Sequence, residues 1–83
     1  MAPISFTILL FARYAELLGS ARLEASLPAG ATVRDAVEWL RTRPGGERLP
    51  VALLVARNMT QCSSDTPIAA GDELALLPPL SGG

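Results

Sequence analysis

The apolar and polar positions along the chain predict four strands. Residues 4–11 alternate at first and are then apolar throughout, which is typical of a central strand whose second half is buried on both faces. Residues 22–27 alternate strictly, so we expect a strand near an edge with one solvated face. Residues 51–56 are apolar without alternation, which favours a strand covered on both faces. Residues 73–77 form a last apolar run, bounded by an acidic turn and by two prolines.

Helix signals occupy two of the segments between these strands. Residues 12–18 carry apolar side chains at helical spacing before a glycine, which predicts a short helix of about two turns. Thr32 is a suitable N-cap, and Asp35 stands at the capping-box position. The apolar stripe that follows predicts the main helix, which we expect to run to about Arg43 and to end at the Pro-Gly-Gly of residues 44–46.

The order strand, strand, helix, strand, strand fits a β-grasp roll. We therefore expect an α+β domain with a mixed sheet and one main helix over residues 1–80, followed by a flexible Ser-Gly-Gly tail over residues 81–83. One helix can cover only one face of a small sheet, so the other face of residues 51–56 and 74–77 has no cover within the chain. Curling of the sheet would protect this face, and so would a partner; the sequence favours the partner.

The C-terminal residues change character abruptly after the last strand. Pro78 and Pro79 have no N–H to give to a sheet, so we expect the chain to leave the sheet there as a stiff, extended spacer. Gly82 and Gly83 then offer the thinnest backbone available, and a free carboxylate follows if the chain ends there. Such an end could be a frayed terminus or a cloning remnant, but the Pro-Pro spacer favours a functional tail that enters a narrow tunnel. A carboxylate is a poor electrophile, so a partner enzyme would first have to activate it, for instance as an acyl adenylate.

Composition narrows the classes of function. The apolar fraction of 49% and the mean hydropathy of +0.33 are high for 83 residues, which indicates that some apolar surface meets a partner. The net charge of −1, with scattered arginines, provides no basic stripe for nucleic acid. No run approaches the roughly 20 apolar residues that span a bilayer, and the start lacks a basic secretory signal, so we expect a cytoplasmic protein without membrane contact.

Nucleophiles and metal ligands are scarce in the sequence. With no histidine and one cysteine, the chain cannot build a zinc site, a catalytic triad or an internal disulfide by itself. Cys62 lies in a Ser/Thr-rich segment with no cation or histidine beside it, so we interpret it as incidental. Trp39 lies off the main helical stripe, and we expect it at the core edge, with a binding anchor as the alternative. The chain has no lysine, which favours a carrier over a lysine-linked polymeric tag, although a compositional bias would have the same result.

Two C-terminal segments, residues 65–68 and 71–83, carry a family pattern, and the second ends Leu-Pro-Pro-Leu-Ser-Gly-Gly. Residues 11–19, 27–28 and 32–35 carry the same pattern more weakly. On these residues the sequence resembles the small subunit of molybdopterin synthase, a ubiquitin-like sulfur carrier. Residues 58–64 depart from the family, which commonly has a hairpin with a bulky apolar residue at this place.

The resemblance implies a role for the tail. Gly83 would be adenylated by a separate ATP-dependent activating enzyme, converted to a thiocarboxylate, and would deliver sulfur to a cyclic pterin precursor in the active site of the synthase large subunit. The chain itself would be a non-catalytic subunit with no bound cofactor. Gly82 would clear the tunnel. The other implied residues are Leu80 and Ser81, which would position the tail, and Leu77, Pro78 and Pro79, which would contact the large subunit.

Two alternatives stay open. The same tail chemistry could serve another acceptor, such as thiazole, a transfer-RNA base or cysteine. The chain could also be a ubiquitin-like interaction module with an inert tail, because a fold alone does not fix a function.

Overall fold

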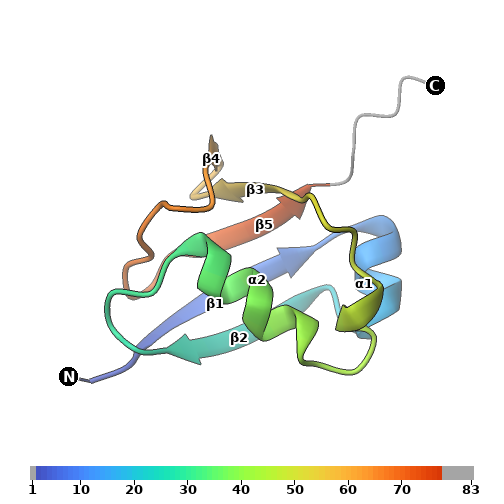
Figure 1. Cartoon of the computed structure of the whole chain (residues 1–83), viewed down its shortest axis with the longest axis horizontal. Coiled ribbons are helices and arrows are strands. Elements are labelled where there is room, and N and C mark those ends of the chain that lie inside the picture. The colour runs from blue at the N-terminus through green and yellow to red at the C-terminus, as the bar shows by residue number, and fades with distance from the viewer. Residues whose placement is uncertain (1, 78–83) are drawn as a thin grey trace.

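A computed structural model describes residues 2–77 of the chain as one sheet with a helix packed across it (Figure 1). The elements in chain order are β1 (Ile4–Leu10), α1 (Ala12–Leu18), β2 (Arg22–Leu27), α2 (Val33–Arg41), a 3₁₀ turn η1 (Gly46–Arg48), β3 (Leu54–Arg57), β4 (Thr60–Cys62) and β5 (Glu73–Leu77). The expected domain boundary at residue 80 lies outside the described residues.

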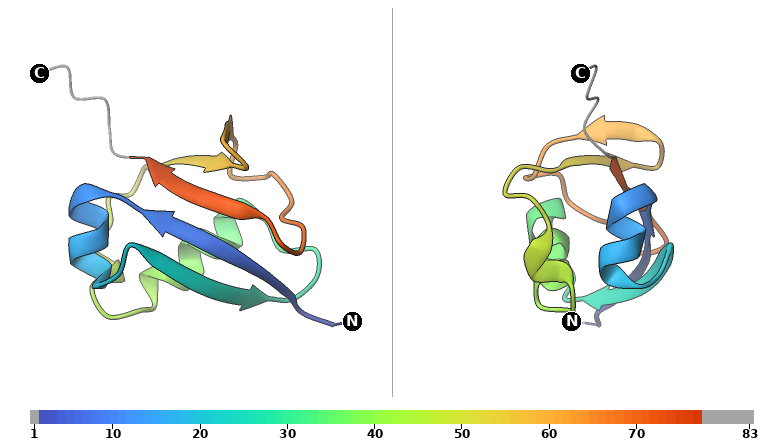
Figure 2. Two further views of the ribbon diagram at one scale, coloured as in Figure 1. Left: turned by 180° about the vertical axis from the view of Figure 1, so that it is seen from behind. Right: turned by 90° about the vertical axis from the view of Figure 1, so that its right-hand side faces the viewer.

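The five strands follow the order β2-β1-β5-β3-β4. The central pair, β1 and β5, is parallel, with Ile8 opposite Leu74, while β2, β3 and β4 pair with their neighbours in antiparallel fashion. Helix α2 crosses one face of this mixed sheet, and the two views of Figure 2 show the other face and the two layers edge-on. This arrangement is the β-grasp roll that the sequence predicts.

The core lies between α2 and the sheet. Alternation along the strands directs one set of side chains toward α2, and these side chains meet the apolar stripe of the helix. The innermost residues are Phe6, Ile8, Leu10, Val33, Ala36, Leu40, Leu74 and Leu76, each 2% exposed or less. Burial of one such large side chain stabilises the fold by roughly 1.5–3 kcal/mol, so this single layer holds the domain together.

The main helix begins where the sequence predicts and ends earlier. The Asp35 carboxylate accepts the N–H of Thr32 over 2.9 Å and completes a capping box. The expected extension to Arg43 is wrong, because α2 ends at Arg41 and Thr42 caps it, with the Thr42 hydroxyl donating to the Trp39 carbonyl over 2.7 Å. Trp39 is half-buried against the core, as expected, and the Arg43 guanidinium lies 4.7 Å from its ring centroid.

The strand expected over residues 51–56 is wrong in its first half. β3 begins only at Leu54, and the Val51 side chain is 96% exposed. The Arg41 guanidinium donates to the carbonyls of Pro50 and Val51 over 2.7 and 3.2 Å. These two carbonyls therefore bind the end of α2 and do not pair with a neighbouring strand. The first strand is also shorter than expected by its last residue, because Phe11 precedes α1 as its N-cap.

A hairpin absent from the sequence prediction follows β3. β3 and β4 pair around a tight turn formed by Asn58 and Met59, so this segment has a hairpin although residues 58–64 depart from the family. The short β4 escaped prediction because Thr60, Gln61 and Cys62 carry no apolar alternation.

Candidate functional site

The described part of the chain ends at β5, just before the predicted tail and its approach. The residues assigned to that tail and its approach, Pro78, Pro79, Leu80, Ser81, Gly82 and Gly83, lie outside the described residues. Leu77 is the last residue described and pairs with Leu54 of β3. Because β5 lies between β1 and β3, any continuation of the chain starts from the interior of the sheet and not from an edge.

The face of the sheet that points away from α2 carries an apolar groove beside Leu77. In β5, Leu74 and Leu76 point into the core, so Glu73, Ala75 and Leu77 point to the opposite side. A cavity of about 490 Å³ opens there, and we call it the outer groove. Its lining residues are Leu9, Phe11, Ala56, Met59, Gln61, Glu73, Ala75 and Leu77, which come from β1, β3, β4, β5 and the connections next to them.

Apolar character is confined to one part of this outer face. Phe11 and Met59, at 44% and 92% exposure, are among the large apolar side chains that meet solvent. Toward β2 the same face becomes polar: the Thr7 hydroxyl donates to the Glu24 carboxylate over 3.1 Å, and Arg22 Nε lies 3.3 Å from it. Among residues 2–77, nothing covers this face at β5, as predicted for residues 74–77, and the face borders the polar side chains of β1 and β2.

A buried carboxylate fixes the hairpin tip against the start of β5. Asp72, 7% exposed, accepts hydrogen bonds from Arg57 Nε (2.6 Å), Asn58 Nδ2 (3.0 Å) and the Ala69 N–H (2.8 Å). Asn58 also donates its N–H to the Glu73 carbonyl over 2.8 Å and accepts the Glu73 N–H on Oδ1 over 3.0 Å. These bonds set the position of the tip relative to the groove.

The environment of Asp72 favours its charged form. Burial alone raises the pKa of a carboxyl, because it removes water from the anion. The hydrogen bonds from Ala69, Arg57 and Asn58, together with the positive charge of Arg57, outweigh that effect and lower the pKa of Asp72 below its ordinary value.

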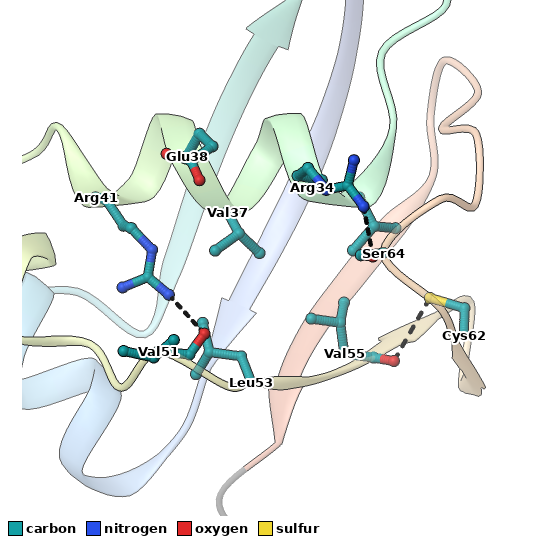
Figure 3. A pocket seen from close by; sticks show the side chains of 10 residues that line it. Arg34, Val37, Glu38, Arg41, Val51, Leu53, Val55, Cys62 and Ser64 are labelled. Carbon is teal, nitrogen blue, oxygen red and sulfur yellow. Dashed lines mark hydrogen bonds between the residues drawn. The ribbon is translucent and has the colours of Figure 1, made fainter.

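Cys62 lies on the other side of the sheet. It lines a cavity of about 290 Å³ between α2 and the β3–β4 hairpin, with Arg34 and Ser64 at the rim (Figure 3). Its thiol is half-buried and donates to the Val55 carbonyl over 3.5 Å. Leu77 points to the outer face, so its side chain and the Cys62 thiol lie on opposite faces of the sheet. The incidental role of Cys62 stays a prediction.

The structure adds site residues that sequence reasoning missed. Met59 and Phe11 contribute to the outer groove, but no local pattern in the sequence indicated that they share a surface. The signal for the Asp72 network was the acidic turn before β5, which we interpreted only as a strand boundary. Within residues 2–77, no cluster of three or more histidine, cysteine or acidic residues could hold a metal ion, and no helix is long and apolar enough to cross a membrane.

The model of the ThiS family matches residues 8–83, which include the terminal Gly-Gly. The chain belongs to the ThiS family. A relative from Arabidopsis thaliana named molybdopterin synthase sulfur carrier subunit is 32% identical, with 99% of this chain and 86% of the relative covered. The small archaeal modifier protein 1 of Haloferax volcanii is 39% identical, with 89% of this chain and 95% of the relative covered. The resemblance drawn from the sequence is thereby confirmed.

Solved structures of other proteins share this fold. A putative molybdopterin converting factor, subunit 1, from Pyrococcus furiosus superposes with a TM-score of 0.85 at 28% identity, covering 93% of this chain and 99% of that one. The complex of subunits 1 and 2 of molybdopterin-converting factor from Helicobacter pylori contains a chain that superposes with a TM-score of 0.70 at 18% identity. The superposition covers 96% of this chain and 100% of that one. At that identity the second likeness shows the fold alone.

Proposed function

We propose that this ThiS-family chain is the sulfur carrier subunit of a molybdopterin synthase. The observation that carries the proposal is the family match, which extends through Gly82 and Gly83. Relatives that match nearly the whole chain include sulfur carrier subunits. The Gly83 carboxylate attacks the α-phosphorus of ATP in an activating enzyme, which releases pyrophosphate and leaves an acyl adenylate. A sulfur nucleophile then displaces AMP, and the terminal thiocarboxylate gives its sulfur to a cyclic pterin precursor.

The tail residues have separate roles in this proposal. Gly83 carries the activated carbonyl, and Gly82 keeps the backbone thin inside the partner's tunnel. Leu80 and Ser81 position the tail, while Pro78 and Pro79 hold it clear of the sheet. The acids and bases that move protons belong to the partner proteins, which accords with a chain that has no histidine.

The large subunit is the partner that we propose for the outer groove. Relatives of this chain are named as subunits, and the Helicobacter pylori protein with the same fold was solved as a complex of subunits 1 and 2. Leu77 lines the outer groove, so a protein seated there would lie beside the last strand residue before the Pro-Pro spacer and the tail. A stable interface of this kind buries at least ~1,200 Å² in total. Holding the thiocarboxylate beside its acceptor makes sulfur transfer a step within the complex, which removes the entropic cost of an encounter.

Mass spectrometry of the intact protein tests this function directly. Protein isolated from its own cells should contain a species in which one terminal oxygen is replaced by sulfur. The purified chain should acquire the same mass on incubation with ATP, a sulfide source and the activating enzyme, and a chain lacking Gly83 should not. Failure of the unchanged chain to be adenylated or thiolated in both settings would refute the proposal.

A second function is favoured by one comparison. The relative from Haloferax volcanii is named a modifier protein, so the same activated Gly83 would join amines of other proteins. Because the sequence has no lysine, this chain would attach singly and would not extend through its own side chains. Covalent adducts of the tagged chain in its own cells, absent when Gly83 is deleted, would support this second function.

A further inference from the structure

The turn between β3 and β4 places an unfavourable residue at its tip. Asn58 and Met59 have φ angles of 50° and 72°, the left-handed values that a tight two-residue hairpin requires at both positions. Asparagine tolerates this conformation and glycine is preferred after it. A methionine pays a steric penalty there, because its Cβ crowds the backbone.

The same residue is also unfavourably solvated. The Met59 side chain is 92% exposed and does not belong to the described residues that pack against the core. It instead lines the outer groove together with Phe11 and Leu77. Backbone strain and apolar exposure therefore coincide at one position, and neither stabilises the free domain.

The hairpin tip is held rigidly in spite of these costs. Asn58 exchanges two hydrogen bonds with the backbone of Glu73, and its side-chain amide donates to the buried Asp72 over 3.0 Å. The start of β5 thus fixes the backbone from which Met59 projects. A partner meets a side chain whose backbone is already ordered, so less conformational entropy is lost on binding.

We propose that Met59 is the anchor by which the outer groove holds the synthase large subunit, and that Asn58 and Asp72 position it. The proposal rests on the proposed function, which supplies the identity of the partner. The large subunit takes the methionine side chain into an apolar pocket of its own. The strand register places Leu77 at the end of β5 opposite to the hairpin tip, so the groove extends from the anchor to the last residue before the predicted spacer. The flexible thioether suits such a pocket.

Substitution by glycine separates binding from stability. In full-length Met59→Gly, the turn becomes the favoured Asn-Gly pair, so we expect Tm to rise by roughly 4 °C. Affinity for the purified large subunit, measured by isothermal titration calorimetry, should fall at least roughly tenfold, as expected for loss of a buried side chain. Met59→Leu is the matched control and should bind with near-normal affinity. A Met59→Gly chain that binds as tightly as the unchanged chain would overturn the proposal.

A double-mutant cycle tests the positioning role of Asn58. Asn58→Ala should lower Tm both in the unchanged chain and in Met59→Gly. It should weaken binding only in the chain that has Met59, because Asn58 acts on the partner through the Met59 side chain. Equal weakening by Asn58→Ala in the unchanged chain and in Met59→Gly would contradict the positioning role.

The same titrations distinguish failure of this inference from failure of the proposed function. If the unchanged chain binds the large subunit and Met59→Gly binds equally well, only the anchor is wrong. If the unchanged chain does not bind, or instead pairs with a second copy through the outer groove, both the partner and the anchor are wrong.

Discussion

Asp72 and Arg57 form the shortest ion pair among the described residues, with Arg57 Nε 2.6 Å from Asp72 Oδ2. Arg57 ends β3 and Asp72 immediately precedes β5, so this contact joins the hairpin to the strand that leads to the tail. The carboxylate lies in the protein interior, whereas the other described ion pairs are exposed.

Removal of this carboxylate should destabilise the fold. Asp72→Ala leaves the Ala69 N–H and the Arg57 and Asn58 side chains without their acceptor, and we expect the free energy of unfolding to fall by about 1–3 kcal/mol. Urea denaturation measures this loss. Asp65→Ala is the control, because its ion pair with Arg34 is exposed and should contribute less than about 1 kcal/mol. Equal losses in the two variants would contradict a special role for Asp72.

Acid should weaken the fold through the same group. The pKa of Asp72 is lowered in the folded chain from its ordinary value of 3.8, so the folded state binds this proton less readily than the unfolded state. Its contribution to stability is therefore complete above pH 3.8 and is lost as the pH falls through the folded pKa.

Urea midpoints measured between roughly pH 2 and pH 7 would show this loss. Asp72→Asn should flatten the acid limb of the profile, and Asp65→Asn should leave most of it in place. An acid limb that is unchanged in Asp72→Asn would show that other carboxyl groups cause it.

A charge placed in the outer groove should weaken partner binding without unfolding the chain. Ala75→Glu directs a carboxylate into the groove, where a bound large subunit would bury it without a partner. We expect affinity to fall by at least roughly tenfold, with an unchanged circular dichroism spectrum. Ser26→Glu, on the exposed strand β2, is the matched control. Loss of affinity in Ser26→Glu but not in Ala75→Glu would show that the partner binds near β2 and not at the outer groove.

Two substitutions distinguish the possible sulfur-bearing residues. Gly82→Val adds bulk and restricts the backbone in the proposed tunnel, so single-turnover sulfur transfer should be strongly impaired. Cys62→Ser nearly preserves size and removes only the thiol, so transfer should remain normal. Each variant is loaded by the activating enzyme and then mixed with the large subunit and pterin precursor. Normal transfer by the valine variant, together with loss in the serine variant, would make Cys62 the carrier.

Local signals predicted the elements that depend on neighbouring residues. The helix start at Thr32 and Asp35 is a contact within one turn, and the sequence was sufficient to place it. The start of β3 was mispredicted because the backbone just before it, at Pro50, is bound by Arg41. No local sequence pattern encodes that contact. The outer groove was beyond sequence reasoning in detail because it combines separate strands, including the polar β4, whose order in the sheet follows from long-range pairing.

The central place of β5 also has a kinetic consequence. The β1–β2 and β3–β4 pairs are joined in the described sheet through β5, whose Glu73 pairs with Thr7 near the other end of the sequence. Pairings of such large sequence separation slow folding, because a long loop must close before the contact forms. During synthesis the sheet cannot close until β5 has emerged from the ribosome. The outer groove and the origin of the tail are therefore completed in the same late step, so an incompletely folded chain lacks the surface that we assign to the large subunit.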